Sequence, residues 1–207
     1  MSLNIIFGPM FAGKSTYLIN TIQSLIDNRI SQEDKDKILE EILIINHSSD
    51  KRYSNYSEIC THDNKKMPCV SLNYLDEIFI DNSDSIDNID NINSDYSINN
   101  IDINKKKYIF IDEGQFFNDL YESVKILLLQ YKKTIYIGGL DGDYKQEPFY
   151  NSRMIDLIPY ATSVTKLTAK CVDCEANAPF TKRLIYSGEQ ILVGGSDSYK
   201  PVCLNHL

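Results

Sequence analysis

The sequence predicts an α/β fold in which helices cover a mostly parallel sheet. Short apolar, β-prone runs alternate along the chain with segments whose apolar residues have helical spacing. The first run ends in a glycine-rich turn that leads straight into such a helical segment. From about Lys170 the pattern changes to turn residues, short β-prone runs and paired cysteines. We therefore expect an α/β domain over residues 1–168 and a small β-rich domain over residues 169–207.

The expected elements of the larger domain follow one another in strand–helix order. After the first strand, apolar residues recur at Leu18, Ile22 and Leu25, which indicates an amphipathic helix. The expected strands cover residues 3–7, 41–46, 108–112, 134–140 and 163–167, and the clearest helices cover residues 14–27 and 120–131. In the smaller domain, residues 183–187 and 190–195 are the β-prone runs.

Residues 81–104 do not fit this alternation. They consist almost only of Asp, Asn, Ser and Ile, without a clear helical or strand period. Such a composition cannot support a packed core, so we expect a low-complexity insertion that forms a loop. The alternative is a functional lid.

The overall charge argues against a protein that binds nucleic acid. The chain has 21 Lys and Arg against 29 Asp and Glu, a net charge of −8, which phosphate groups repel. No apolar run is long enough to span a bilayer, and the N-terminus lacks the pattern of a secretory signal peptide. We expect a cytoplasmic protein with neither nucleic acid nor a membrane as its partner.

The stretch GPMFAGKS at residues 8–15 has the spacing of a phosphate-binding P-loop. In such a loop, glycines let backbone N–H groups surround phosphate oxygens, a lysine adds positive charge and a serine hydroxyl binds Mg²⁺. The strand before it and the helix after it are the context that the motif requires, whereas a plain glycine-rich turn requires neither. The predicted binding residues for ATP and Mg²⁺ in this loop are Gly8, Pro9, Met10, Phe11, Ala12, Gly13, Lys14 and Ser15.

An acidic pair ends the expected strand in the stretch YIFIDEGQFF. Asp112 is the natural carboxylate partner of a P-loop at Mg²⁺. Glu113 faces the opposite way if the chain is still extended there, and it is a candidate general base for a hydroxyl or water. The alternative is an acidic pair that only caps a strand end.

The group that accepts the phosphate is indicated by two loops. No Asn-Lys-x-Asp motif is present, which disfavours a GTPase. The loop GLDGDYKQEPF follows an expected strand, where α/β proteins place ligand loops, and its Leu140, Tyr144 and Phe149 are suited to a flat apolar slot. A second glycine-rich loop, GGSDSYKPVC, contains Tyr199. Both loops favour a small-molecule acceptor over water.

Two pairs of metal-ligand residues stand in the C-terminal part. Cys171 and Cys174 form a CxxC pair, and Cys203 and His206 form a CxxH pair. Three thiolates and one imidazole suit tetrahedral Zn²⁺, and four protein ligands close the site, so the zinc is expected to be structural. A redox CxxC would leave the second pair unexplained. Cys60 and Cys69 are read as plain thiols.

Taken in order, eight stretches of the chain resemble the cellular and poxviral type of thymidine kinases. They are GPMFAGKST, DKRYS, CTHD, IDEGQFF, GLDGDYKQEPF, KLTAKCVDC, PFTKRL and GGSDSYKPVC. The resemblance implies a P-loop NTPase-like core with a zinc-bound lasso domain that closes over a nucleoside. It implies transfer of the γ-phosphoryl group of ATP to the 5′-hydroxyl of thymidine, and a homotetramer or dimer.

The resemblance also implies roles for individual residues. Glu113 would be the general base. The ATP and Mg²⁺ region would include Asp50, Lys51, Arg52, Asp112, Glu113, Gly114 and Gln115. The thymidine site would be formed by Met10, Phe116, Leu140, Tyr144, Phe149, Thr181 and Tyr199, with the lasso backbone of Gln190, Ile191, Leu192, Val193 and Gly194 hydrogen-bonded to the base.

Three features depart from the family pattern. Tyr144 stands where vertebrate cytosolic members have phenylalanine, His206 replaces a fourth cysteine, and compact members lack the insertion at residues 81–104. Two other readings stay open at this point. One is a zinc-ribbon P-loop ATPase that binds nucleic acid, which the negative charge disfavours. The other is an inactive nucleotide-binding regulator, which the intact Lys14, Ser15 and acidic pair disfavour.

Overall fold

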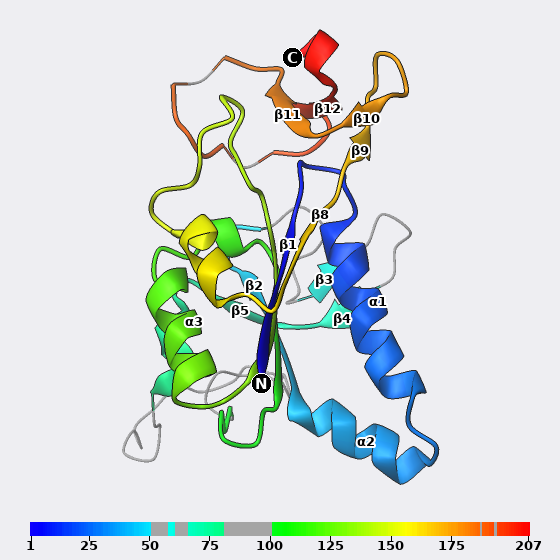
Figure 1. Ribbon diagram of the computed structural model, residues 1–207, viewed down its shortest axis with the longest axis vertical. Helices are drawn as coiled ribbons and strands as arrows, with labels where there is room; N and C mark the ends of the chain where they lie inside the picture. Colours follow the sequence, from blue (N-terminus) through cyan, green and yellow to red (C-terminus); the bar gives the residue numbers. More distant parts are fainter. Residues whose placement is uncertain (51–57, 61–65, 81–100, 187, 193) are drawn as a thin grey trace, which may run out of the picture.

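The centre of the molecule is a six-stranded parallel sheet with the strand order β5-β2-β6-β7-β1-β8 (Figure 1). The computed structural model describes residues 1–50, 58–60, 66–80, 101–186, 188–192 and 194–207. The sheet consists of β1 (Ser2–Phe7), β2 (Ile42–His47), β5 (Val70–Leu72), β6 (Tyr108–Ile111), β7 (Thr134–Gly139) and β8 (Ser163–Lys166). The predicted α/β class is confirmed. The three-residue β5, too short for a recognisable pattern, was not expected.

In the part of the chain that the structure describes, three α-helices accompany the sheet. They are α1 (Lys14–Asp27), α2 (Gln32–Glu41) and α3 (Leu120–Leu129). α1 has the expected bounds, and α3 ends two residues before the expected end. α2 was not expected, although its start has a recognisable signal. Ser31 is its N-cap and accepts a hydrogen bond from the backbone N–H of Asp34. Short 3-10 helices cover Leu75–Phe79, Gly114–Phe116, Met154–Tyr160 and Leu204–His206.

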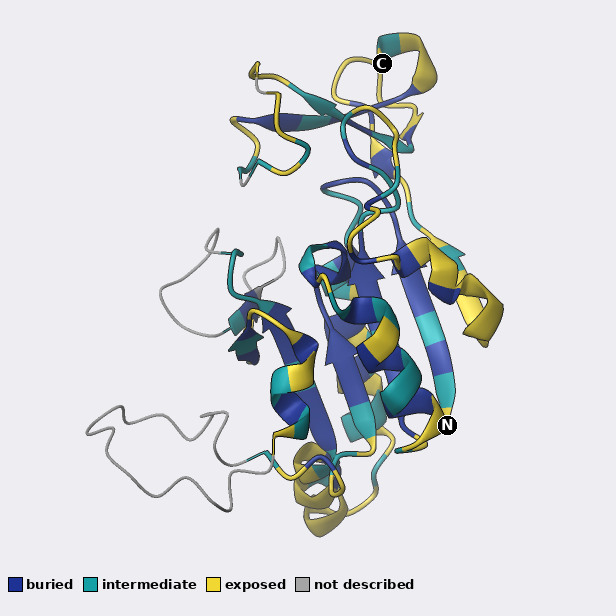
Figure 2. Ribbon diagram, turned by 90° about the vertical axis from the view of Figure 1, so that its left-hand side faces the viewer, coloured by how far each residue is buried: buried dark blue, intermediate teal, exposed yellow. Residues whose placement is uncertain are grey.

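The alternation of side chains along the strands builds a core on each face of the sheet. In β1, Leu3, Ile5 and Phe7 pack with α3 on one face, whereas Ile6 packs with α1 and α2 on the other. β6 repeats this pattern, with Phe110 on the α1 face. Figure 2 shows the strands buried along most of their length and much of α2 exposed. Two buried faces explain why these strands read as continuous apolar runs in the sequence.

The C-terminal part forms two small antiparallel ladders instead of extending the sheet. They pair β9 (Ala169–Lys170) with β10 (Asn177–Ala178), and β11 (Phe180–Arg183) with β12 (Tyr199–Val202). The expectation of strands at residues 183–187 and 190–195 is wrong: of the described residues in these runs, only Arg183 lies in a strand. The backbone carbonyls of residues 190 and 192 accept hydrogen bonds from the side chains of Arg183 and Tyr199. In a β-ladder these carbonyls would instead accept from backbone N–H groups of a neighbouring strand.

Two further regions complete the description. β3 (Glu58–Cys60) and β4 (Lys66–Pro68) form a ladder beside α1, where Ile59 and Cys69 pack against Ile19. Most of the expected insertion, residues 81–100, lies outside the described residues, and at its C-terminal end Ile103 is buried in the core. Within the described part of the chain, no helix has the length and apolar character needed to cross a membrane.

Candidate active site and metal centre

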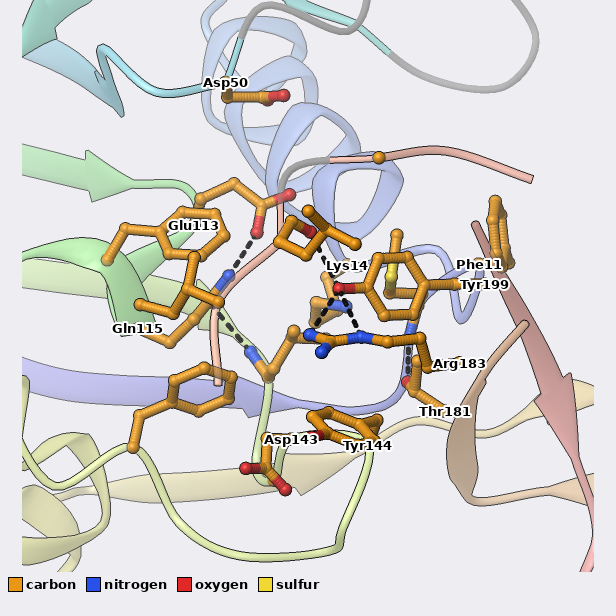
Figure 3. A pocket seen from close by; sticks show the side chains of 18 of the residues that line it. Phe11, Lys14, Asp50, Glu113, Gln115, Asp143, Tyr144, Thr181, Arg183 and Tyr199 are labelled. Carbon is orange, nitrogen blue, oxygen red and sulfur yellow. Dashed lines mark hydrogen bonds between the residues drawn. The ribbon is translucent and has the colours of Figure 1, made fainter. Parts of the chain in front are cut away.

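A pocket lies at the carboxyl ends of the sheet strands, between the loops that follow them and the C-terminal ladders (Figure 3). This is the position at which open α/β sheets bind ligands. The predicted site residues that line it are Met10, Phe11, Gly13, Lys14, Ser15, Asp50, Glu113, Gln115, Phe116, Leu140, Tyr144, Phe149, Thr181, Gln190, Ile191, Leu192, Gly194 and Tyr199. Gly8, Pro9, Ala12, Asp112 and Gly114 are not among the lining residues. Lys51, Arg52 and Val193 lie outside the described residues.

The P-loop owes its shape to its two glycines. Gly13 has a φ of 82°, a left-handed conformation that glycine adopts without strain, and α1 starts at the next residue. A Cβ on Gly8 would lie 2.8 Å from the carbonyl oxygen of Leu167, so a larger residue does not fit there. Lys14 is buried, and its Nζ donates a hydrogen bond to the Pro9 carbonyl across the loop at 2.8 Å. The backbone of the P-loop thus holds the ammonium group of Lys14 within the loop.

The acidic pair follows β6 and is buried. Burial and the adjacent negative charge of Glu113 raise the pKa of Asp112 to about 7, against the opposing effects of a Ser15 hydrogen bond and the charge of Lys14. Glu113 itself has φ 53° and ψ 42°, so the chain is not extended there and the simple alternation of side chains does not apply. Its side chain nevertheless lines the pocket. A non-glycine residue held in this left-handed region is a feature that clusters at functional sites.

Gln115 connects the acidic pair to the loop after β7. Its Nε2 donates to the Glu113 carboxylate at 2.5 Å, and its Oε1 accepts from the backbone N–H of Leu140 at 2.9 Å. Gln115 is almost fully buried. Gly139 makes this approach possible, because a Cβ there would lie 2.9 Å from Oε1 of Gln115 and 2.6 Å from the sulfur of Met154.

The opposite side of the pocket combines aromatic residues of the loop after β7 with residues of the C-terminal ladders. Thr181 on β11 accepts a hydrogen bond from the backbone N–H of Met10 at 2.9 Å, which joins the C-terminal part directly to the P-loop. The hydroxyl of Tyr199 donates to the carbonyl of Leu192 at 2.7 Å. Tyr144 lines the pocket from the loop after β7.

Five lining residues are not among the predicted site residues: Thr16, Ser49, Gly142, Asp143 and Arg183. A signal existed for Arg183, because it lies two residues after Thr181 on the same strand and therefore on the same face. Asp143 lies inside the quoted GLDGDYKQEPF loop. Its buried carboxylate accepts hydrogen bonds from the backbone of Lys145 and Glu147 and from the side chain of Gln190.

The four predicted metal ligands come together at the C-terminal end. The sulfurs of Cys171, Cys174 and Cys203 and a ring nitrogen of His206 all lie within 4.8 Å of one another. The two sulfurs of Cys174 and Cys203 are 3.6 Å apart, and Nδ1 of His206 lies 3.3 and 3.6 Å from the sulfurs of Cys203 and Cys171. A tetrahedral ion with Zn–S bonds of about 2.3 Å places its sulfurs about 3.8 Å apart. This Cys₃His cluster therefore fits a metal ion such as zinc.

Comparison with known proteins agrees with this arrangement along the whole chain. The sequence model of the thymidine kinase family matches residues 1–207. The chain is 35% identical to a thymidine kinase of Oryza sativa subsp. japonica over 99% of its own length and 65% of the rice protein. It is 36% identical to the thymidine kinase of Rabbit fibroma virus over 97% of this chain and 93% of the viral protein. It is 32% identical to the cytosolic thymidine kinase of Homo sapiens over 97% of this chain and 70% of the human protein.

The family match and the geometry point the same way, since the pocket gathers the P-loop, an acidic pair and an aromatic wall, with a metal-ligand cluster in the same C-terminal part. The chain belongs to the thymidine kinase family.

Proposed function

We propose that this protein transfers the γ-phosphoryl group of ATP to the 5′-hydroxyl of thymidine. The observation that carries the proposal is that one pocket is lined both by the P-loop and by a group of aromatic residues, with Glu113 among the lining residues. The aromatic residues include Tyr144, Phe149 and Tyr199. A hydrolase needs only a phosphate site and a water. A pocket with an additional aromatic wall suits a second, planar substrate. The family membership supports the same reading.

At the phosphate end, the P-loop backbone and Lys14 would bind the ATP phosphates and neutralise charge that develops during transfer. The side chains of Ser15 and Asp112 are hydrogen-bonded to each other, so a hydroxyl oxygen and a carboxylate lie side by side. Such hard oxygen ligands fit Mg²⁺. When bound with ATP, Mg²⁺ would supply further charge neutralisation at the phosphates. We assign Asp50 to the same region because it lines the pocket from the loop after β2.

Glu113 would take the proton of the 5′-hydroxyl as general base. Gln115 supports this role, because its buried amide donates a hydrogen bond to one oxygen of the Glu113 carboxylate. This hydrogen bond defines the orientation of the carboxylate. We therefore reassign Gln115 from direct ATP contact to the positioning of Glu113. Its second hydrogen bond ties the carboxylate to the loop that would border the nucleoside.

At the nucleoside end, the thymine ring would lie among Met10, Phe116, Leu140, Tyr144, Phe149, Thr181 and Tyr199, all of which line the pocket. The backbone of residues 190–194 would hydrogen-bond the base edge. We further propose that the Cys₃His cluster holds structural Zn²⁺, which would stabilise the small C-terminal part from which Thr181 and Tyr199 come. We propose a cytoplasmic homotetramer or dimer, which light scattering coupled to size-exclusion chromatography tests.

The deciding experiment is the transfer of labelled γ-phosphate from Mg·ATP, with thymidine, deoxycytidine, water or single-stranded DNA as acceptor or additive. Labelled thymidine monophosphate that appears only with thymidine supports the proposal. Hydrolysis stimulated by DNA, without labelled thymidine monophosphate, would reject it in favour of a zinc-ribbon ATPase.

A further inference from the structure

Arg183 joins three separate segments around the pocket. It ends β11, where its cross-strand partner is Tyr199 of β12. Its Nη1 donates to the carbonyl of Glu189 at 2.6 Å, and its Nη2 donates to the carbonyl of Gln190 at 2.9 Å. The Cζ atom of its guanidinium group lies over the ring of Tyr144, 3.8 Å from the ring centroid. In Figure 3 the side chain runs between Tyr199 and Tyr144, inside the ring of lining residues.

The hydroxyl of Tyr199 extends this network. It accepts hydrogen bonds from Nη2 and Nε of Arg183 at 2.8 and 3.2 Å, and it donates to the carbonyl of Leu192 at 2.7 Å. The carbonyls of residues 189, 190 and 192 are therefore held from one arginine, two directly and one through the tyrosine. Only a planar fork with several N–H donors can do this, because a lysine ammonium is a point charge without fixed donor directions.

A second tie holds the same segment from another element. Nε2 of Gln190 donates to the carboxylate of Asp143 at 3.0 Å and to the carbonyl of Pro148 at 3.3 Å. Asp143 is itself fixed by the backbone N–H groups of Lys145 and Glu147. Residues 189–192 are thus attached both to the C-terminal ladder and to the loop after β7, on which Tyr144 lies.

We propose that Arg183 is a positioning residue that holds residues 189–192 and the ring of Tyr144 in the arrangement that receives the nucleoside. This inference rests on the proposed function. It gives a role to Arg183, which lies in the stretch PFTKRL but is not among the predicted site residues. Because the segment is ordered before the substrate arrives, less conformational entropy is lost on binding. The Arg183 contacts lie among the aromatic lining residues, whereas Lys14 and Ser15 line the phosphate end of the pocket.

Steady-state kinetics of Arg183→Gln and Arg183→Lys test the role. Loss of several charge-assisted hydrogen bonds should raise the KM for thymidine by roughly 10- to 100-fold in Arg183→Gln. The KM for ATP should stay within about twofold of the unsubstituted protein, since the substitution removes binding interactions for thymidine and leaves the phosphate-binding residues unchanged. Arg183→Lys should raise the KM for thymidine as much as Arg183→Gln, because a positive charge alone does not replace the several N–H donors of the planar guanidinium group. Full recovery in the lysine variant would overturn this account.

Arg153 offers a matched control. Its guanidinium lies 3.9 Å from the ring centroid of Tyr121 and pairs with Asp156, but it does not line the pocket. Arg153→Gln and Arg153→Lys therefore remove the same kind of arginine–tyrosine contact, and both KM values should be unchanged.

Hydrogen–deuterium exchange of peptides that cover residues 189–192 separates this inference from the proposed function, because it needs no turnover. Exchange should become at least about tenfold faster in Arg183→Gln and stay unchanged in Arg153→Gln. Unchanged exchange in Arg183→Gln, or an equal fall in activity with both substrates together with a lower Tm, would overturn the positioning role. If the unsubstituted protein phosphorylates no thymidine, the proposed function fails, while the exchange result still decides whether Arg183 holds the segment.

Discussion

The side-chain amide of Gln115 joins the carboxylate of Glu113 to the backbone N–H of Leu140, with heavy-atom distances of 2.5 and 2.9 Å. Glu113 follows β6 and Leu140 follows β7, so one buried amide connects two neighbouring strand ends. The orientation of the amide is defined, because a carboxylate needs the NH₂ group and a backbone N–H needs the carbonyl oxygen. The proposed base and the border of the nucleoside site are therefore coupled through Gln115.

Replacing Gln115 tests this coupling. Gln115→Leu keeps the bulk but removes both hydrogen bonds, so we expect kcat to fall roughly 10- to 100-fold while the KM for ATP changes little. Gln115→Glu places a second carboxylate against Glu113 and disfavours ionisation of the base. A base works only when ionised, so the acidic limb of the kcat profile should move to higher pH. An unshifted profile with wild-type kcat in both variants would contradict the coupling.

The role of Glu113 is tested by Glu113→Gln. We expect kcat to fall by about 10²- to 10⁴-fold, because general base catalysis contributes an effect of this size. ATP binding, measured by isothermal titration calorimetry, should be retained, since Lys14 and the loop backbone are unchanged. Glu122→Gln is a suitable control, because Glu122 is an exposed carboxylate that contacts Lys125 and Arg153 outside the pocket. Near-full turnover of Glu113→Gln would show that another group takes the proton.

The metal cluster predicts one zinc ion for each chain by atomic absorption. Cys203→Ser should lose this zinc and lower the Tm, because the small C-terminal ladders depend on the ion for stability. His206→Cys should keep the zinc, since a fourth thiolate completes an equally common ligand set. Full stability and activity after exhaustive chelation would argue against a structural metal.

The hydrogen bond between Thr181 and Met10 predicts that the two parts of the chain stabilise each other. Thr181→Val has nearly the same shape but removes the acceptor of the buried Met10 N–H, which should lower the free energy of unfolding by about 1–3 kcal/mol. Urea denaturation measures this loss. Thr21→Val is the control, because the hydroxyl of Thr21 donates an exposed hydrogen bond to the carbonyl of Tyr17 within α1, and its loss should cost much less. Equal losses in the free energy of unfolding for the two substitutions would show that the Thr181–Met10 hydrogen bond does not stabilise the fold more than an exposed one.

Much of the core fold follows from local properties of the chain. Strands buried on both faces need uninterrupted apolar residues, so β1, β6 and β7 are visible in the sequence before any contact is known. α1 is visible for a similar reason, since its apolar stripe has to repeat every turn. The P-loop and the CxxC and CxxH pairs are also local, because close spacing along the chain already places their side chains together.

The connections between distant segments were decided only by the tertiary structure. Gln115 meets Leu140, Arg183 meets Tyr144, and Thr181 meets Met10 across 25, 39 and 171 positions of the chain, and no local period encodes such encounters. The same cause explains why residues 190–195, β-prone in composition, are not a strand. The sequence by itself determined which strands form and which residues can bind phosphate and metal. The packing of the C-terminal ladders onto the strand ends determined which side chains share the pocket, because such long-range contacts form only once the chain has folded.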